Sequence, residues 1–179
     1  MKCTLVVCLC LCISLYLYLS NDMLYIHSDI DNQKYVVLNM GDPQEGADTL
    51  ANISKRLLQL KQYLQTHHPD DIITKNIESR FDTSNISEGS PDSSYTSYTV
   101  DKGEKMVFCI RDSDKRIHNM NLLMYVCIHE LAHVGSVSKG HNGEFKKHFE
   151  FLLSIANKLK IYHPIPFGKK EISYCGTVI

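Results

Sequence analysis

Residues 126–149 read VCIHELAHVGSVSKGHNGEFKKHF, and this stretch decides how the rest of the chain is interpreted. It contains the HExxH pattern His129-Glu130-Leu131-Ala132-His133. Residues four apart lie on the same face of a helix, so two imidazoles at this spacing can bind one metal ion at about 2.0–2.1 Å. Glu130 lies one step around the helix, where it can reach a zinc-bound water and act as a general base.

The third metal ligand is expected after the helix, because a catalytic zinc ion has three protein ligands and one open position. His141 is the favoured candidate, since the residues before it are rich in Gly and Ser and allow the chain to turn back toward the metal. Glu144 and Glu150 are the alternatives, because some zinc peptidases use a Glu from a later helix.

The segment Leu122 to Val134 is apolar on nearly every side, which predicts a central, buried helix. His, Glu and His in such a helix require a function or mutual hydrogen bonds, because burying polar groups without partners costs free energy. The competing interpretation is a pair of hydrogen-bonded core histidines. An HExxH match also arises by chance in about a few per cent of chains of this size, so the helical context carries much of the argument.

The flanking sequence predicts a mixture of strands and helices. We expect a strand at 34–40, a helix that begins at Asp42-Pro43 and ends before Pro69, and a second helix at about 70–81. A polar surface loop is expected at 82–97. A β-hairpin (98–100 and 106–110), a helix at about 143–160 and an extended C-terminal segment complete the prediction.

The order of hairpin, HELAH helix and His141-Asn142-Gly143-Glu144-Phe145 resembles the WLM and SprT-like zinc peptidases. The resemblance covers roughly Phe81 to Leu159. It implies an α+β fold, a minimal zincin-like domain with a small sheet packed on helices and a central HExxH helix. It also implies that His129, His133 and His141 bind one zinc ion and that Glu130 is catalytic. The stretch between His133 and His141 is longer than in typical WLM members.

The first twenty residues differ from the rest of the chain. Thr4 to Leu19 is an uncharged apolar run, marginal in length for a membrane-spanning helix. We therefore divide the chain into 1–20, a hydrophobic anchor or signal segment, and 21–179, a metallopeptidase domain with its core at about 81–160. Lys2 before the run favours a domain on the non-cytosolic side, secreted if the segment is cleaved.

Charge and cysteine content narrow the remaining possibilities. A formal net charge of -1 argues against a strongly cationic nucleic-acid binder, although it leaves a local basic patch open. Outside the apolar segment there are Cys109, Cys127 and Cys175, which allow at most one disulfide within the domain. We expect a monomer.

The sequence therefore predicts a membrane-anchored zinc metallopeptidase that hydrolyses peptide bonds with a Glu-activated zinc-bound water. Tyr162, His163 and Tyr174 are candidates for stabilising the oxyanion, although packing or surface roles are the ordinary explanation for each. Two other functions remain open. One is a non-catalytic zinc domain that acts as a membrane-tethered interaction module, and the other is a soluble protease that repairs protein–DNA crosslinks, as many relatives of this class do.

Overall fold

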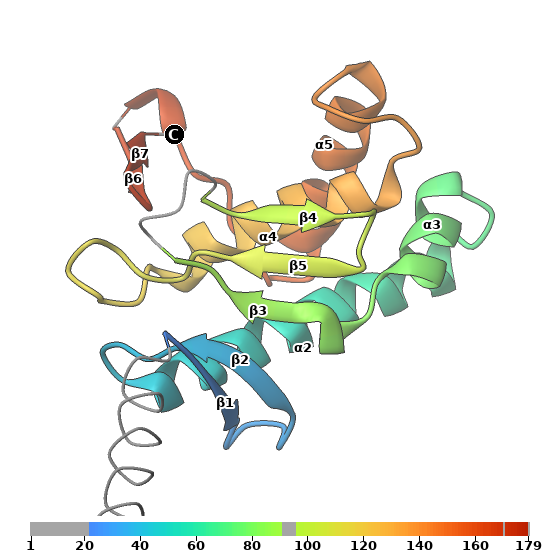
Figure 1. Cartoon of the computed structure of the whole chain (residues 1–179). Coiled ribbons are helices and arrows are strands. Elements are labelled where there is room, and N and C mark those ends of the chain that lie inside the picture. The colour runs from blue at the N-terminus through green and yellow to red at the C-terminus, as the bar shows by residue number, and fades with distance from the viewer. Residues whose placement is uncertain (1–21, 91–95, 170, 179) are drawn as a thin grey trace, which may run out of the picture.

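A five-stranded mixed β-sheet forms one layer of the protein (Figure 1). The computed structural model describes residues 22–90, 96–169 and 171–178. The strands are β1 (Met23–His27), β2 (Lys34–Leu38), β3 (Ile86–Glu88), β4 (Tyr98–Val100) and β5 (Lys105–Phe108), in the spatial order β1-β2-β3-β5-β4. β2, β3 and β5 run parallel, whereas β1 and β4 are antiparallel to their neighbours. β4 is thus an edge strand.

The second layer consists of α2 (Pro43–His67), α3 (Ile72–Arg80), α4 (Met120–Gly135) and α5 (Gly143–Lys158). α2 begins where the sequence predicts, because the Asp42 side chain accepts hydrogen bonds from the amides of Gln44 and Glu45. α4 lies behind the sheet in Figure 1 and packs against α3, α5 and α2. Its Leu123, Ile128 and Leu131 are buried, which confirms the prediction of a central helix.

Three predictions need correction. β1 was not expected, since the sequence before residue 34 was not assigned to a strand. The expected loop at 82–97 contains a 3-10 helix (Thr83–Asn85) and the buried strand β3. The C-terminal segment is not simply extended, because it holds a 3-10 helix (Phe167–Lys169) and a separate hairpin of β6 (Ser173–Tyr174) and β7 (Thr177–Val178).

β3 could not be recognised from the sequence, because two of its three residues, Ser87 and Glu88, are polar and yet buried. Glu88 is stabilised there by an ion pair with Arg111, whose Nε lies 2.9 Å from Glu88 Oε1. The other carboxylate oxygen accepts the Leu38 amide at 2.9 Å. A buried charge is tolerated when it is paired and hydrogen-bonded in this way, and a hydrophobic pattern cannot reveal such a strand.

The expected anchor or signal segment, residues 1–20, lies outside the described residues. Within the described part of the chain, every helix is too short or too polar to cross a bilayer.

Candidate metal centre

Three histidine rings converge at one point on the surface of the helical layer. His129 and His133 come from the same face of α4, and His141 comes from the loop before α5. His141 Nε2 lies 2.9 Å from His129 Nε2 and 3.2 Å from His133 Nε2. Two nitrogens bound to one tetrahedral zinc ion stand about 3.3 Å apart, given zinc–nitrogen bonds of about 2.0–2.1 Å. The spacing of the three rings therefore fits a zinc ion.

The electrostatic environment keeps two of these imidazoles neutral. Burial, followed by the neighbouring His133 and His141, lowers the pKa of His129 to about 4. Burial, followed by His141 and Lys102, lowers the pKa of His133 to about 4 as well. Because a metal ion binds only deprotonated imidazole, both rings are ready to bind it at neutral pH.

Phe145 forms the floor beneath the cluster. Its ring stacks on His133 with centroids 4.2 Å apart, and meets the rings of His129 and His141 edge-on at 4.8 Å each. Phe145 is 3% exposed and lies four residues after His141, so one turn of α5 brings it under the three rings. An apolar support of this kind fixes the orientation of the rings and excludes water from one side.

Glu130 lines the same cleft as the three histidines. The cleft has a volume of about 700 Å³. The Glu130 side chain is buried, and this burial raises the pKa of its carboxyl group to about 7. A carboxyl group whose pKa lies near neutral can both accept and return a proton, which general acid–base chemistry requires.

The two alternative ligands do not join the cluster, which consists of His129, His133 and His141. Glu144 instead accepts hydrogen bonds from the amides of Val137 and Ser138, at 2.8 and 2.9 Å, and from the Ser138 hydroxyl. These hydrogen bonds lower the pKa of Glu144 to about 2. Glu150 is exposed on α5.

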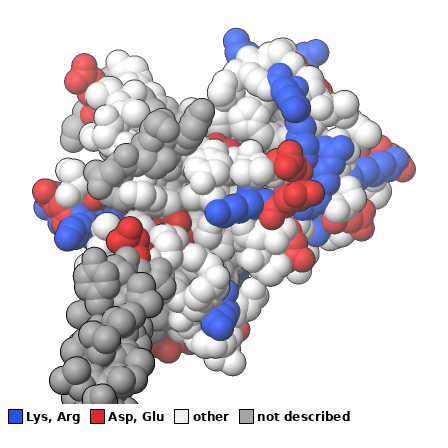
Figure 2. Space-filling model, in the orientation of Figure 1, with Lys and Arg blue, Asp and Glu red and all other residues white. Residues whose placement is uncertain are grey.

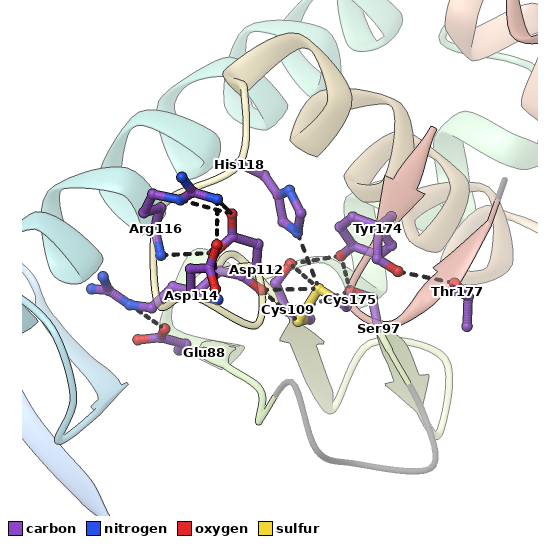
Figure 3. The surroundings of a disulfide bond; sticks show 11 residues. Glu88, Ser97, Cys109, Asp112, Asp114, Arg116, His118, Tyr174, Cys175 and Thr177 are labelled. Carbon is purple, nitrogen blue, oxygen red and sulfur yellow. Dashed lines mark hydrogen bonds and ion pairs between the residues drawn. A yellow bond between two sulfur atoms is a disulfide. The ribbon is translucent and has the colours of Figure 1, made fainter. Parts of the chain in front are cut away.

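The C-terminal hairpin contributes one residue to the lining of the cleft, and a disulfide attaches this hairpin to the sheet (Figure 3). A disulfide joins Cys109, just after β5, to Cys175, and the adjacent Tyr174 lines the cleft. The Tyr174 hydroxyl donates to the Cys109 carbonyl at 2.7 Å and lies 2.6 Å from Ser97 Oγ, which accepts the Cys109 amide. The sequence allowed one disulfide but did not identify this pair.

Of the three residues considered as candidates for stabilising the oxyanion, the structure places only Tyr174 at the cleft. Tyr174 borders the cleft, but its hydroxyl is engaged with Ser97 and Cys109. Tyr162 and His163 are not among the residues that line the cleft. Tyr162 packs near Tyr125, and His163 is exposed while its amide donates to Asn121. Ser97, Thr99 and Tyr125 line the cleft and were missed by sequence reasoning, because nothing in their local pattern points to it.

The edge strand β4 forms one rim of the cleft and leads into the turn that carries Lys102. Basic side chains gather where α3, this turn and the loop before α5 lie (Figure 2). Arg80, Lys102 and Lys139 are close enough to influence one another electrostatically, and Glu144 partly offsets their charge.

Comparison with known proteins places the fold. The described architecture is similar to the crystal structure of Wss1 from Saccharomyces cerevisiae, with a TM-score of 0.53 and 19% sequence identity, over 69% of this chain and 87% of that chain. No family model matches the sequence. The fold and the cluster define an α+β protein of Wss1-like architecture with three histidines close enough together to hold a metal ion.

Within that class, the chain belongs to the family of the uncharacterized protein R325 of Acanthamoeba polyphaga mimivirus. The two are 39% identical over 162 residues, which cover 87% of this chain and 81% of that protein. Protein 136R of Invertebrate iridescent virus 6 is 34% identical over 85 residues, and protein 042R of Invertebrate iridescent virus 3 is 40% identical over 83 residues. Each of these two matches spans slightly less than half of either protein.

Proposed function

We propose that this protein is a zinc-dependent metallopeptidase in which His129, His133 and His141 bind the metal and Glu130 is the general base. The convergence of the three Nε2 atoms within the cleft that Glu130 lines is the observation that carries the proposal. The Wss1-like fold is consistent with the WLM and SprT-like resemblance of the HELAH region.

The residues of the cleft divide the chemistry among them. Zinc, when bound, would polarise the peptide carbonyl and make a water molecule more acidic. Glu130 takes a proton from the attacking water and returns it to the leaving amine, a role that matches a carboxyl pKa of about 7 before metal binding. The histidines hold the metal, and Phe145 keeps their rings in place.

The substrate is proposed to be an extended peptide. β4 is the outermost strand of the sheet and borders the cleft, so a peptide can add to it as a further strand through main-chain hydrogen bonds. This arrangement would carry a scissile bond across the cleft next to the histidines without demanding a particular sequence.

Replacement of Glu130 tests the proposal. Glu130→Gln is expected to keep the zinc ion while hydrolysis of an unstructured protein such as casein falls at least about 100-fold, since a positioned general base contributes about 10²–10⁴ in rate. Glu150→Gln is the matched control, because Glu150 is exposed on α5 outside the cluster. Full activity in Glu130→Gln would contradict the mechanism.

A non-catalytic zinc module is the competing function, and the same experiment separates it from a peptidase. If the protein is such a module, both the wild type and Glu130→Gln would bind zinc, and neither would cleave casein. The membrane anchor and the non-cytosolic location remain proposals that rest on the sequence of residues 4–19.

A further inference from the structure

The loop that delivers His141 has little burial to hold it in place. Residues 136–141, called the ligand loop below, connect α4 to the start of α5. Ser136 is buried, but Val137 is 61% exposed, and Lys139 and Gly140 are also exposed. A polar, exposed loop normally samples many conformations, and ordering it costs conformational entropy. The position of His141 therefore depends on hydrogen bonds to the loop.

Glu144 supplies one set of these hydrogen bonds from the first turn of α5. Its two carboxylate oxygens accept the amides of Val137 and Ser138, and one of them also accepts the Ser138 hydroxyl. The Asn142 side-chain amide donates to the same hydroxyl at 2.7 Å. The start of α5 therefore fixes the middle of the ligand loop.

Lys102 supplies the second set from the β4–β5 turn. Its Nζ donates to the carbonyls of His133 at 3.2 Å, Ser136 at 2.9 Å and Ser138 at 2.7 Å. An ammonium group has three donors, so Lys102 uses all of them on the end of α4 and the ligand loop. The turn that borders the cleft is thereby tied to the loop that carries His141.

Helix capping alone does not explain these contacts. Arg80 donates to the carbonyls of Val134 and Ser136, and Asn76 donates to that of Gly135, so the end of α4 has its own partners. Lys102 and Glu144 both extend further, to Ser138. They bind its carbonyl, amide and hydroxyl together, three residues before His141.

We propose that Lys102 and Glu144 are positioning residues that together clamp Ser138, through its carbonyl on one hand and its amide and hydroxyl on the other, and thereby hold His141 in place for the metal. This inference rests on the proposed function, because the ligand loop matters only if His141 binds zinc. It assigns to two charged residues outside the ligand set a role in metal affinity.

Zinc affinity measured by competition with a chelator tests the clamp. Lys102→Met and Glu144→Gln are each expected to weaken zinc binding about 10-fold, within the range known for residues that orient ligands. Arg80→Met is the matched control, since Arg80 caps the same helix end without contacting Ser138. It should bind zinc within about twofold of wild type. Cobalt-substituted protein gives a second readout, because the visible spectrum of Co²⁺ reports ligand geometry directly.

Equal zinc affinity in wild type and in both folded variants would overturn the clamp. Hydrogen exchange on the metal-free wild-type protein adds a test that needs no variant. The amides of Val137 and Ser138 should be protected because Glu144 accepts both, and rapid exchange at both would also overturn the inference. Wild-type protein that binds no zinc would instead contradict the proposed function, while the exchange result would still decide whether the clamp forms.

Discussion

Three imidazoles held close together determine the behaviour of the site at the scale of single residues. Neutral rings at 2.9 and 3.2 Å cannot all satisfy one another, because each neutral imidazole has one donor and one acceptor nitrogen. Protonating any of them places a positive charge beside the others. The cluster is therefore tolerated when neutral, and its geometry suits a cation with an affinity for nitrogen.

The unfolding free energy of the metal-free protein should therefore depend on pH. His129 and His133 have folded-state pKa values of about 4, below the ordinary 6.5, mainly because they are buried. Between pH 6.5 and 4 the unfolded chain binds protons that these two rings exclude in the folded protein, so their contribution to stability should be lost as the pH falls through this window. Glu130, whose pKa is raised to about 7, contributes in the opposite direction over the same range. Urea unfolding at pH 7 and pH 5 measures the difference.

The variant His129→Gln/His133→Gln provides the control for this pH dependence. It should lose most of the decrease, because Gln does not titrate. The same change in stability between pH 7 and pH 5 in the metal-free wild type and in this variant would contradict the arrangement of the rings.

The spacing of His129 and His133, and the Gly- and Ser-rich residues before His141, favoured the three histidines that lie together in the structure, with Glu144 and Glu150 as the alternatives for the third position. The contacts around them were not predictable from sequence. From the sequence, Glu144 was a candidate metal ligand. Its actual hydrogen bonds, to the amides of Val137 and Ser138, form only because the loop folds back onto the start of α5, which the sequence does not reveal. Similarly, Lys102 shows no pattern that connects it with residues more than 30 positions away.

At the scale of elements, the β4–β5 turn connects the edge strand with the ligand loop through Lys102. Asp101 and Lys102 both have positive φ values, 42° and 60°, and Gly103 has a φ of 119°. The Gly103 conformation is open to glycine and strained for other residues. A Cβ atom at Gly103 would also lie 2.7 Å from the Arg80 carbonyl oxygen.

Gly103→Ala should consequently destabilise the protein by about 1–3 kcal/mol, because it adds backbone strain and a close contact with backbone. It should also displace Lys102 and weaken zinc binding. Gly143→Ala is the control, since a Cβ atom there meets open space at the start of α5, and its effect should stay within about 0.5 kcal/mol. Unfolding in urea gives both values. Equal stability of the two variants would be incompatible with this turn geometry.

Most helices were predictable because their caps and apolar periodicity are local features, as Asp42 and the apolar α4 illustrate. β3 was not predictable, since its Glu88 is buried only because Arg111, 23 residues later, neutralises it. β1 pairs with β2 along its whole length, yet its alternation of partly buried and exposed residues is short and gives a weak signal.

At the scale of the whole molecule, the Cys109–Cys175 disulfide joins the end of the sheet to the C-terminal hairpin. Among the residues that the structure describes, the hairpin forms a sheet of its own and shares no strand pairing with the larger sheet. Tyr174 and the disulfide therefore carry much of its attachment, and Tyr174 also lines the cleft. His118 packs against Tyr174 on the same side.

Loss of this disulfide should lower stability and loosen the hairpin. Its half-cystines are 66 positions apart, and the loop-closure entropy for that length corresponds to about 4 kcal/mol. Cys109→Ser/Cys175→Ser should show this loss in urea unfolding. Relative to the wild type, its amide exchange should accelerate more at 171–178 than in α4. A reductant should have the same effect on the wild type and none on the variant, where only buried Cys127 remains in the described domain. Unchanged stability after reduction would contradict the role assigned to the bond.

The most direct test of the account is the zinc content of a protein that begins near Asn21, measured beside its His141→Ala variant. We expect about one zinc ion per chain in the wild type and much weaker binding in the variant, because a catalytic zinc ion needs three protein ligands. Well-folded wild-type protein without zinc would contradict the central claim, and unchanged zinc in His141→Ala would show that another residue is the third ligand.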